Sequence, residues 1–349
     1  MIIPETYIGA LLLIILSMVC WGSWANAFKL TPKWRFELFY YDYSLGVLIA
    51  AIVAAYTFGS LGNELTFSDN LLIAMKRNMA YAVAAGAVFN LANILLVAAI
   101  SVAGLAVAFP VGIGLALVVG VIWNYALNPQ GNPMLLFGGV ILVVGAIVVD
   151  AMAYSRHAGA PAPSTVKGKT KAARAGSSKS LKGILLSLVS GVLMGSFYPL
   201  VEMGKGLGPD QAGLGPYAVA FLFAIGVFLS TFIFNLYFLN LPVQGEPLSM
   251  FAYFHGTIKQ HALGILGGVI WCVGAVANFV AASAPRAVHV GPAVSYAVGQ
   301  GATMVSALWG LLLWKEFAGA NPNVRLLLGL MFILFIAGLL LVSIAPLYA

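Results

Sequence analysis

Charged residues are scarce in this sequence. Asp, Glu, Lys and Arg together make up 8% of its 349 residues, whereas a soluble domain carries about 25%. Hydrophobic residues make up 62%, and the mean hydropathy is +1.00. This composition excludes a soluble globular protein and predicts an all-α polytopic membrane protein embedded in a lipid bilayer.

Cysteine and catalytic residue sets are also scarce. Cys20 and Cys272 are the only cysteines and lie in apolar segments, so we expect buried apolar side chains, not a disulfide or a metal site. No paired carboxylates and no Ser/His/Asp or Cys/His set are spaced for catalysis. We therefore expect no enzyme, no cofactor and no metal. The net charge of +7 comes mostly from one segment and does not predict a nucleic-acid partner.

Long apolar runs dominate the sequence. A membrane-spanning helix needs about 20 mostly apolar residues. We expect ten such helices, at residues 7–30, 38–58, 80–101, 104–126, 134–154, 181–203, 216–239, 261–284, 290–314 and 325–347.

A polar segment divides these helices five and five. Residues 155–180 are rich in Ala, Pro, Gly, Ser and Lys, a composition that cannot bury a core. We therefore predict a first five-helix repeat at 1–154, a flexible basic cytoplasmic loop at 155–180 and a second five-helix repeat at 181–349.

Lysine and arginine predict the orientation. The connections after the first, fifth, seventh and ninth segments carry thirteen of them, and the opposite side carries four. Positive residues concentrate on the cytoplasmic side. With an even number of segments, both termini are expected outside and the central loop in the cytoplasm, in a bacterial inner membrane.

Four matches in order indicate an internal repeat. Gly22 and Gly195 lie in similar motifs 173 residues apart, and Trp123 and Trp309 lie 186 apart. Between them, Asp42-Tyr43 matches Pro216-Tyr217 and Asn93 matches Asn278. Halves with an odd number of spans insert in opposite orientations, so this pattern predicts two inverted five-helix repeats around a site near the midplane.

The first segment carries aromatic residues in its interior. Trp21 and Trp24 flank Gly22 and Ser23. Indole rings offer flat surfaces to a sugar or heterocycle, and small residues allow close approach. The alternative is an interfacial aromatic belt with helix packing at the small residues.

Polar side chains in other segments are costly unless protein or water satisfies them. Each could bind a ligand or clamp two helices together. We predict a substrate site from these side chains and from the aromatic residues near them: Trp21, Ser23, Trp24, Asn90, Asn93, Tyr198, Trp271, Asn278, Tyr296 and Gln300.

Three carboxylates lie inside predicted spans: Asp42, Glu202 and, at the cytoplasmic end of its segment, Asp150. Asp42 and Glu202 are candidates for proton coupling, because a carboxylate partly withdrawn from water can exchange a proton near neutrality. The alternative for each is an interfacial ion pair or helix cap, which for Asp42 would involve Lys33 or Arg35.

The layout and two motifs resemble the drug/metabolite transporter superfamily, in particular its glucose/ribose porters and ureide permeases. One motif is Trp21-Gly22-Ser23-Trp24 followed by Phe39 to Ser44, and the other runs from Gly291-Pro292 through Gln300 to Trp314-Lys315-Glu316-Phe317. The resemblance implies proton-driven uptake of a small polar solute, either a sugar or a ureide- or nucleobase-like compound. The aromatic, Asn and Gln side chains, with no Arg or Lys expected among them, favour a neutral solute. The alternative function is export of metabolites or drugs, which the superfamily also performs.

Overall fold

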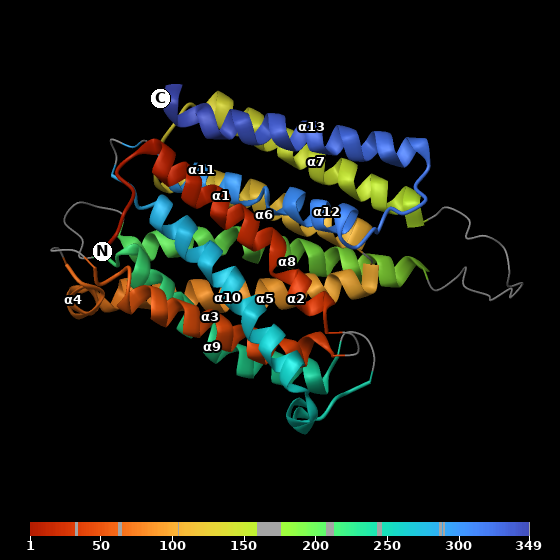
Figure 1. Ribbon diagram of the computed structural model, residues 1–349, viewed down its shortest axis with the longest axis horizontal. Helices are drawn as coiled ribbons and strands as arrows, with labels where there is room; N and C mark the ends of the chain where they lie inside the picture. The colour runs from red at the N-terminus through yellow and green to blue at the C-terminus, as the bar shows by residue number, and fades with distance from the viewer. Residues whose placement is uncertain are drawn as a thin grey trace, which may run out of the picture.

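The computed structural model describes residues 1–31, 34–61, 65–103, 105–158, 176–206, 213–242, 246–285, 288 and 290–348. All regular elements in these ranges are helices (Figure 1). They are α1 (Tyr7–Ser23), α2 (Ala25–Lys29), α3 (Phe36–Tyr56), α4 (Phe67–Ile73), α5 (Lys76–Ala103), α6 (Leu105–Leu127), α7 (Pro133–Ala158), α8 (Gly176–Lys205), α9 (Pro216–Asn240), η1 (Met250–His255), α10 (Ile258–Ala281), α11 (Pro292–Gly299), α12 (Ala302–Leu312), α13 (Pro322–Ile344) and η3 (Ala345–Tyr348).

Eight helices in the described part of the chain are long and apolar enough to cross a membrane. They coincide with eight of the ten predicted segments and occupy Tyr7–Lys29, Phe36–Tyr56, Lys76–Ile100, Pro133–His157, Leu181–Lys205, Pro216–Asn240, Ile258–Ala281 and Pro322–Tyr348. The predicted segments 104–126 and 290–314 are the other two. The first is represented by a shorter apolar helix, Val111–Leu127. Residues 159–175, most of the predicted flexible loop, lie outside the described residues.

The prediction of one continuous helix over 290–314 is wrong. The chain leaves the helical path at Gln300 and Gly301, between α11 and α12. Glycine lowers helix stability, and here Gly299 and Gly301 flank Gln300. A Cβ on Gly301 would lie 2.5 Å from the sulfur of Met18 in α1. The break therefore occurs where this segment passes close to α1.

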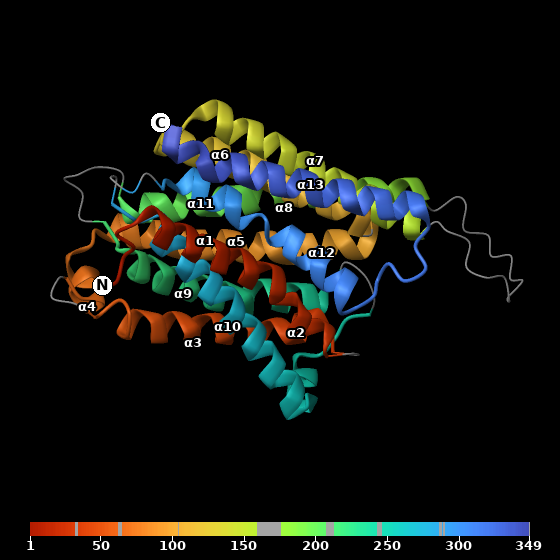
Figure 2. The ribbon, with the colours of Figure 1, turned by 45° about the horizontal axis from the view of Figure 1, so that its top comes forward.

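Both ends of the chain lie at the same end of the helix bundle. Figures 1 and 2 show the N- and C-termini together at one end, and the end of α7 and the start of α8 at the other. The helices of the two halves interlace. In the most extensive contacts, α5 packs against α8 and α9, α3 against α9 and α10, α1 against α10, α6 against α8, and α7 against α13.

Glycines allow reciprocal close packing of two helix pairs. Between α3 and α10, a Cβ on Gly46 would lie 2.1 Å from the carbonyl oxygen of Ile265, and one on Gly268 would lie 1.9 Å from that of Tyr43. Between α5 and α9, Gly86 and Gly226 approach opposing carbonyl oxygens in the same way, at 2.0 and 2.1 Å. Small residues let membrane helices pack backbone to backbone.

The helices α7 and α13 also pack closely through a pair of glycines. A Cβ on Gly139 of α7 would lie 2.6 Å from the carbonyl oxygen of Gly338, and one on Gly338 of α13 would lie 2.7 Å from that of Gly139. Each of these two glycines therefore contacts the backbone of the other.

The motif glycines Gly22 and Gly195 make equivalent contacts. A Cβ on Gly22 would lie 2.5 Å from the carbonyl oxygen of Ala302, and one on Gly195 would lie 2.9 Å from that of Ala116. Ala302 follows Ala116 by 186 residues, the spacing that also separates the tryptophans of these two segments.

Candidate functional site

A pocket of about 180 Å³ lies at the centre of the bundle, between α1, α5, α8, α10 and the α11–α12 break. We call it the central pocket. Five predicted site residues line it: Trp21, Trp24, Asn93, Trp271 and Gln300. The other lining residues are Gly22, Ala25, Phe89, Leu96, Ile113, Met194, Phe197, Ala302, Thr303 and Ser306.

Aromatic rings form the walls of the central pocket. The rings of Trp21 and Trp271 are stacked, with centroids 5.9 Å apart and planes 19° apart. The ring of Phe89 also packs against Trp271, with centroids 4.3 Å apart, and the ring of Trp24 packs against Tyr43 at 4.9 Å. Flat rings of this kind bind planar or sugar ligands by stacking. The walls are held by helices from both halves of the chain.

Polar groups line one side of the central pocket. Asn93 donates a 3.1 Å hydrogen bond from Nδ2 to the hydroxyl of Tyr40. The side chains of Gln300, Thr303 and Ser306 make no hydrogen bond within the described residues. Thr303 is buried, Gln300 is half-buried and Ser306 is exposed. Polar groups withdrawn from water are normally hydrogen-bonded. These three are therefore available to a bound polar molecule.

Thr303 and Ser306 were missed from the sequence. They follow Gln300 at intervals of three residues, which places polar groups on one side of a helix. That stripe in an apolar segment is a signal that could have identified them. Phe89 and Phe197 had no such signal, because phenylalanine is common throughout the apolar segments.

Asn90 lies outside the central pocket. It is fully buried and donates from Nδ2 to the hydroxyls of Ser230, at 2.7 Å, and Thr231, at 3.1 Å, on α9. Asn90 and Asn93 therefore have different environments, although they lie one turn apart on α5.

Asn278 on α10 bonds to side chains of three other helices, α1, α8 and α11, outside the central pocket. Its Oδ1 accepts hydrogen bonds from the hydroxyls of Tyr198, at 2.6 Å, and Ser295, at 2.9 Å. Its Nδ2 donates to the hydroxyl of Ser17 at 3.2 Å. Asn278, Tyr198, Ser17 and Ser295 are all buried, so the geometry favours the helix-clamp alternative for Asn278 and Tyr198.

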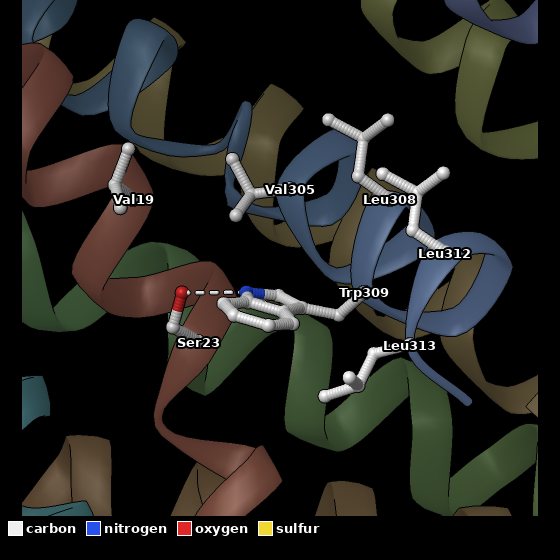
Figure 3. Close-up of a pocket in the computed structure, with 7 residues that line it drawn as sticks. All are labelled: Val19, Ser23, Val305, Leu308, Trp309, Leu312 and Leu313. Carbon is white, nitrogen blue, oxygen red and sulfur yellow. Dashed lines mark hydrogen bonds between the residues drawn. The ribbon is translucent and has the colours of Figure 1, made fainter.

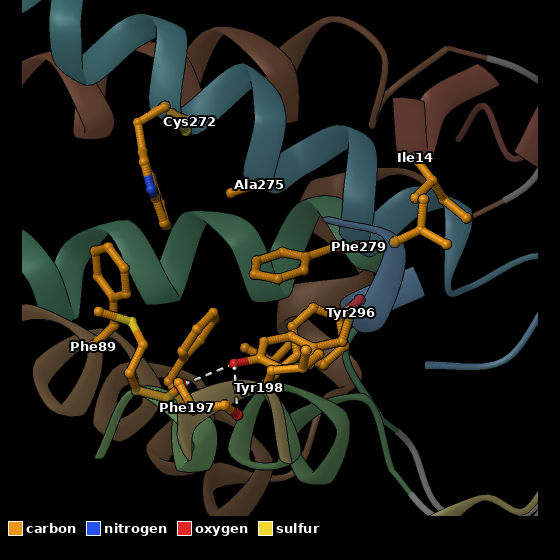
Figure 4. Packing of buried hydrophobic residues seen from close by; sticks show 14 of the residues in the cluster. Ile14, Phe89, Phe197, Tyr198, Cys272, Ala275, Phe279 and Tyr296 are labelled. Carbon is orange, nitrogen blue, oxygen red and sulfur yellow. Dashed lines mark hydrogen bonds between the residues drawn. The ribbon is translucent and has the colours of Figure 1, made fainter. Parts of the chain in front are cut away.

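Tyr296 is also buried behind the pocket. Its hydroxyl donates to the carbonyl oxygens of Ala116, at 3.2 Å, and Met194, at 3.3 Å. Figure 4 shows Tyr296 among Phe197, Tyr198 and Phe279 in the aromatic core. Tyr296 and Gln300 therefore do not face one cavity together, because the Tyr296 hydroxyl bonds to α6 and α8 in the core whereas Gln300 lines the central pocket.

Ser23 faces a different hollow. An apolar groove of about 370 Å³ lies between α1 and α12 and is lined by Val19, Ser23, Val305, Leu308, Trp309, Leu312 and Leu313 (Figure 3). Leu312 is 76% exposed and Leu313 57%. An apolar, outward-facing groove on a membrane helix suits lipid chains better than a polar solute.

Hydrogen bonds beyond the central pocket join α1 and α2 to the chain around the end of α12. The indole nitrogen of Trp309 donates to the hydroxyl of Ser23 at 2.8 Å (Figure 3). The indole nitrogen of Trp314 donates to Oδ1 of Asn26 at 2.6 Å. We use the name seam for these two hydrogen bonds together with the Lys29–Glu316 ion pair described next.

An ion pair completes the seam. Lys29 bonds to Oε1 of Glu316, and the hydroxyl of Tyr154 donates to Oε2 at 2.6 Å. Burial pushes the pKa of the Glu316 carboxyl upward, but the hydrogen bonds from Lys29 and Tyr154 and the positive charge of Lys29 outweigh it. The pKa is therefore held below its ordinary value.

Asp42 has different partners from those predicted. Its Oδ1 accepts a 2.5 Å hydrogen bond from the hydroxyl of Tyr253, and Oδ2 lies 2.8 Å from Nδ1 of His261. The expected ion pair with Arg35 is wrong, because Arg35 binds Glu37. Lys33, the other expected partner, lies outside the described residues.

Glu202 forms an ion pair on its own helix. Its Oε1 lies 2.7 Å from Nζ of Lys205, which also donates to the carbonyl oxygen of Phe279 at 3.2 Å. This arrangement matches the ion-pair alternative for Glu202.

Comparison with known proteins gives consistent matches over nearly the whole chain. Residues 39–167 and 165–345 match the family described as "Ureide permease". The chain is 24% identical to "Ureide permease 2" of Arabidopsis thaliana, with 97% of each chain covered, and 24% identical to "Ureide permease 1" of the same plant, with 94% of each covered. A solved crystal structure has a similar fold, with a TM-score of 0.60 at 16% identity over 95% of this chain and 97% of that one.

Proposed function

Because the chain belongs to the ureide permease family, it is an integral membrane transporter and not an enzyme, and we propose that it imports a planar ureide or nucleobase-like solute through the central pocket. The observation that carries this proposal is the combination of stacked indoles with unpartnered amide and hydroxyl groups in one cavity. A ureide ring presents flat faces together with N–H and C=O groups along its edge. Such a ring can stack on Trp21 while its edge bonds to Gln300 and Asn93.

The pocket lining favours a neutral solute. None of its fifteen lining residues in the described chain is charged. A carboxylate or phosphate substrate would need a positive partner in a site withdrawn from water. A sugar satisfies the same requirement, so it is the comparison ligand in the test below. Export of metabolites or drugs is the alternative direction.

Ten spans in two inverted repeats form the second part of the proposal. An inverted five-plus-five repeat relates α3 to α9 and α5 to α10, so the α3–α10 and α5–α9 contacts become equivalent. Both pairs carry reciprocal glycine contacts. The matched contacts of Gly22 with Ala302 and of Gly195 with Ala116 support the same relation. The α6 segment and the α11–α12 segment supply the two spans that bring the eight long helices to ten.

This repeat supports alternating access. The seam joins α1 and α2 to the α12 region near the end of the bundle where α7 ends. At the positions equivalent to Ser23 and Trp309, Ser196 bonds within its own helix and Trp123 makes no side-chain hydrogen bond in the described chain. The Ser23–Trp309 contact is thus hydrogen-bonded, whereas the equivalent positions Ser196 and Trp123 do not bond to each other. Such an asymmetry is expected for a transporter that is closed on one side of the membrane.

The orientation and energy source complete the proposal. We place both termini outside and the 155–180 segment in the cytoplasm, on the charge distribution of the connections. Solute uptake is driven by protons. The bacterial inner membrane remains our expected location, and the relatives reported above are plant proteins.

Uptake by purified protein in proteoliposomes tests the proposed function. We expect radiolabelled allantoin (a ureide) or uracil to enter by exchange, and to accumulate with an inward proton gradient. Glucose is the matched neutral polar control. Uptake of glucose alone would mean that the substrate is a sugar and not a ureide. No exchange of any of the three compounds would refute the proposal that the protein is an importer of such solutes.

A further inference from the structure

Asp42, Tyr253 and His261 form a cluster separate from the central pocket. The Asp42 side chain is 2% exposed, and both of its oxygens are bonded, one to Tyr253 and one to His261. The His261 side chain is 25% exposed. The imidazole therefore reaches solvent while the carboxylate does not.

Aromatic rings hold the imidazole in place. Its ring packs edge-on against Tyr253, with centroids 4.7 Å apart, and against Trp34, at 5.6 Å. Nδ1 faces Asp42, and Nε2 has no hydrogen-bond partner within the described residues. Nε2 is thus the position at which a proton from solvent can bind.

The other charged groups nearby do not bond to Asp42. Arg35 and Glu37 at the start of α3 bond to each other, and Arg35 also donates to the carbonyl oxygen of Glu246. His255 on η1 and Lys259 on α10 make no bond to Asp42 in the described chain. On α9, Asn235 binds the backbone of Glu37. The titratable partners of Asp42 are therefore His261 and Tyr253.

Tyr253 acts as a fixed donor in this cluster. Burial raises the pKa of its hydroxyl, and the hydrogen bond to Asp42 raises it further. The hydroxyl therefore keeps its proton at neutral pH and leaves the exchangeable proton to the Asp42–His261 pair.

We propose that the Asp42–His261 pair is the binding site for the proton that drives uptake; this inference rests on the proposed transport function. With Asp42 ionised and His261 neutral, the pair carries one negative charge. One proton from solvent binds Nε2, the Nδ1–H remains donated to Asp42, and the pair becomes neutral overall. Histidine is the side chain whose charge normally changes between pH 5 and 8.

Protonation can be transmitted to the solute through two tightly packed helices. A Cβ on Gly264 of α10 would lie 2.4 Å from Cβ of Asp42 on α3, so the two backbones touch at the pair itself. Burying a net charge costs more than burying a neutral pair. Loss of the proton therefore weakens the α3–α10 contact. Trp271, ten residues after His261 on α10, carries that change into the central pocket.

Transport assays with wild-type protein and variants test the pair. We expect D42N and H261Q to exchange allantoin across proteoliposome membranes at a rate within about twofold of wild type. Their accumulation of allantoin under a proton gradient should be at least tenfold lower than that of wild type. H255Q, six residues away and exposed, is the matched control and should accumulate normally. Gradient-driven accumulation by H261Q equal to wild type, with exchange intact, would overturn the proposal while leaving the transporter in place.

A readout that does not depend on transport separates the two proposals. Trp34 contacts His261, so binding of a proton to the imidazole should change indole fluorescence as the pH is lowered. We expect this transition in wild type and H255Q, and its loss in H261Q and W34F. A transition unchanged in H261Q would overturn the proton site; the expected titration without any solute exchange would refute only the proposed function.

Discussion

The indole nitrogen of Trp314 donates a 2.6 Å hydrogen bond to the side-chain oxygen of Asn26, which lies 288 residues earlier in the chain. Lys29, one turn after Asn26, also lies over the Trp314 ring, with Nζ 5.4 Å from the centroid. One tryptophan thus contacts two residues of α2. These contacts are interactions that must break if α1 and α2 separate from α12.

Removing the Trp314 hydrogen bond should open the seam. A hydrogen bond between membrane helices contributes about 1 kcal/mol, so W314F should raise the open population about fivefold. The measurement is the labelling rate of S306C by a membrane-impermeant maleimide, in a background without Cys20 and Cys272 and in vesicles exposing the 155–180 segment. W123F is the control, because Trp123 has no such bond, and it should label like the parent. Equal rates in W314F and the parent would remove the seam as a gate.

Asn93 and Asn90 should respond differently to alanine. N93A removes an amide from the central pocket together with one bond to Tyr40, so it should weaken allantoin binding at least tenfold and lower the free energy of unfolding by no more than N90A does. N90A removes bonds to α9 and should lower the free energy of unfolding by about 1 kcal/mol while leaving affinity unchanged. Isothermal titration and thermal melting of the purified proteins measure both. Loss of affinity in N90A at unchanged stability would contradict the assignment.

The seam ion pair should stabilise the fold in a pH-dependent way. The folded-state pKa of Glu316 lies below its ordinary value of 4.5. Its stabilisation is therefore present above that ordinary value and is lost as pH falls through the folded-state pKa. Wild type should melt higher than E316Q at pH 7, and the gap should close on acidification below pH ~4.5. A gap that widens with acid would show that the carboxylate is not stabilised by Lys29 and Tyr154.

Two adjacent glycines of α7 should show opposite effects when replaced by alanine. Alanine is favoured over glycine in a helix by about 1 kcal/mol, and a Cβ on Gly138 meets nothing within 4 Å. G138A should therefore leave the melting temperature unchanged or raise it. G139A places a Cβ 2.6 Å from the carbonyl oxygen of Gly338 and should lower it by separating α7 from α13. Fluorescence-detected size-exclusion melts give the comparison; equal stability in both variants would mean that α7 and α13 do not pack as described.

Much of the fold could be predicted from the sequence because membrane burial depends on local composition. A run of about 20 apolar residues is visible without any tertiary information, and eight helices of sufficient length and apolarity lie where predicted. The break at Gln300 was not predictable in the same way. Gly299 and Gly301 weaken the helix, but Met18 and Trp21, which pack against them, are distant in sequence.

The candidate site was predictable only as a set of polar and aromatic residues. Sequence spacing places Asn90 and Asn93 one turn apart, yet it cannot say which neighbour each amide meets. His261 and Tyr253 were missed as partners of Asp42 for a related reason. They lie more than 200 residues away, beyond residues 155–180, and only tertiary packing brings them together.

The interlacing of the two halves means that most of the protein's internal surface is, in effect, a subunit interface. Residues 1–154 place α3, α5, α6 and α7 directly against helices of residues 181–349. The covalent link through residues 155–180 then acts mainly by keeping the two partners at high effective concentration. We therefore expect a chain cut within that link to assemble as a heterodimer of two polypeptides, each of which alone would leave its helix-packing faces uncovered in the lipid.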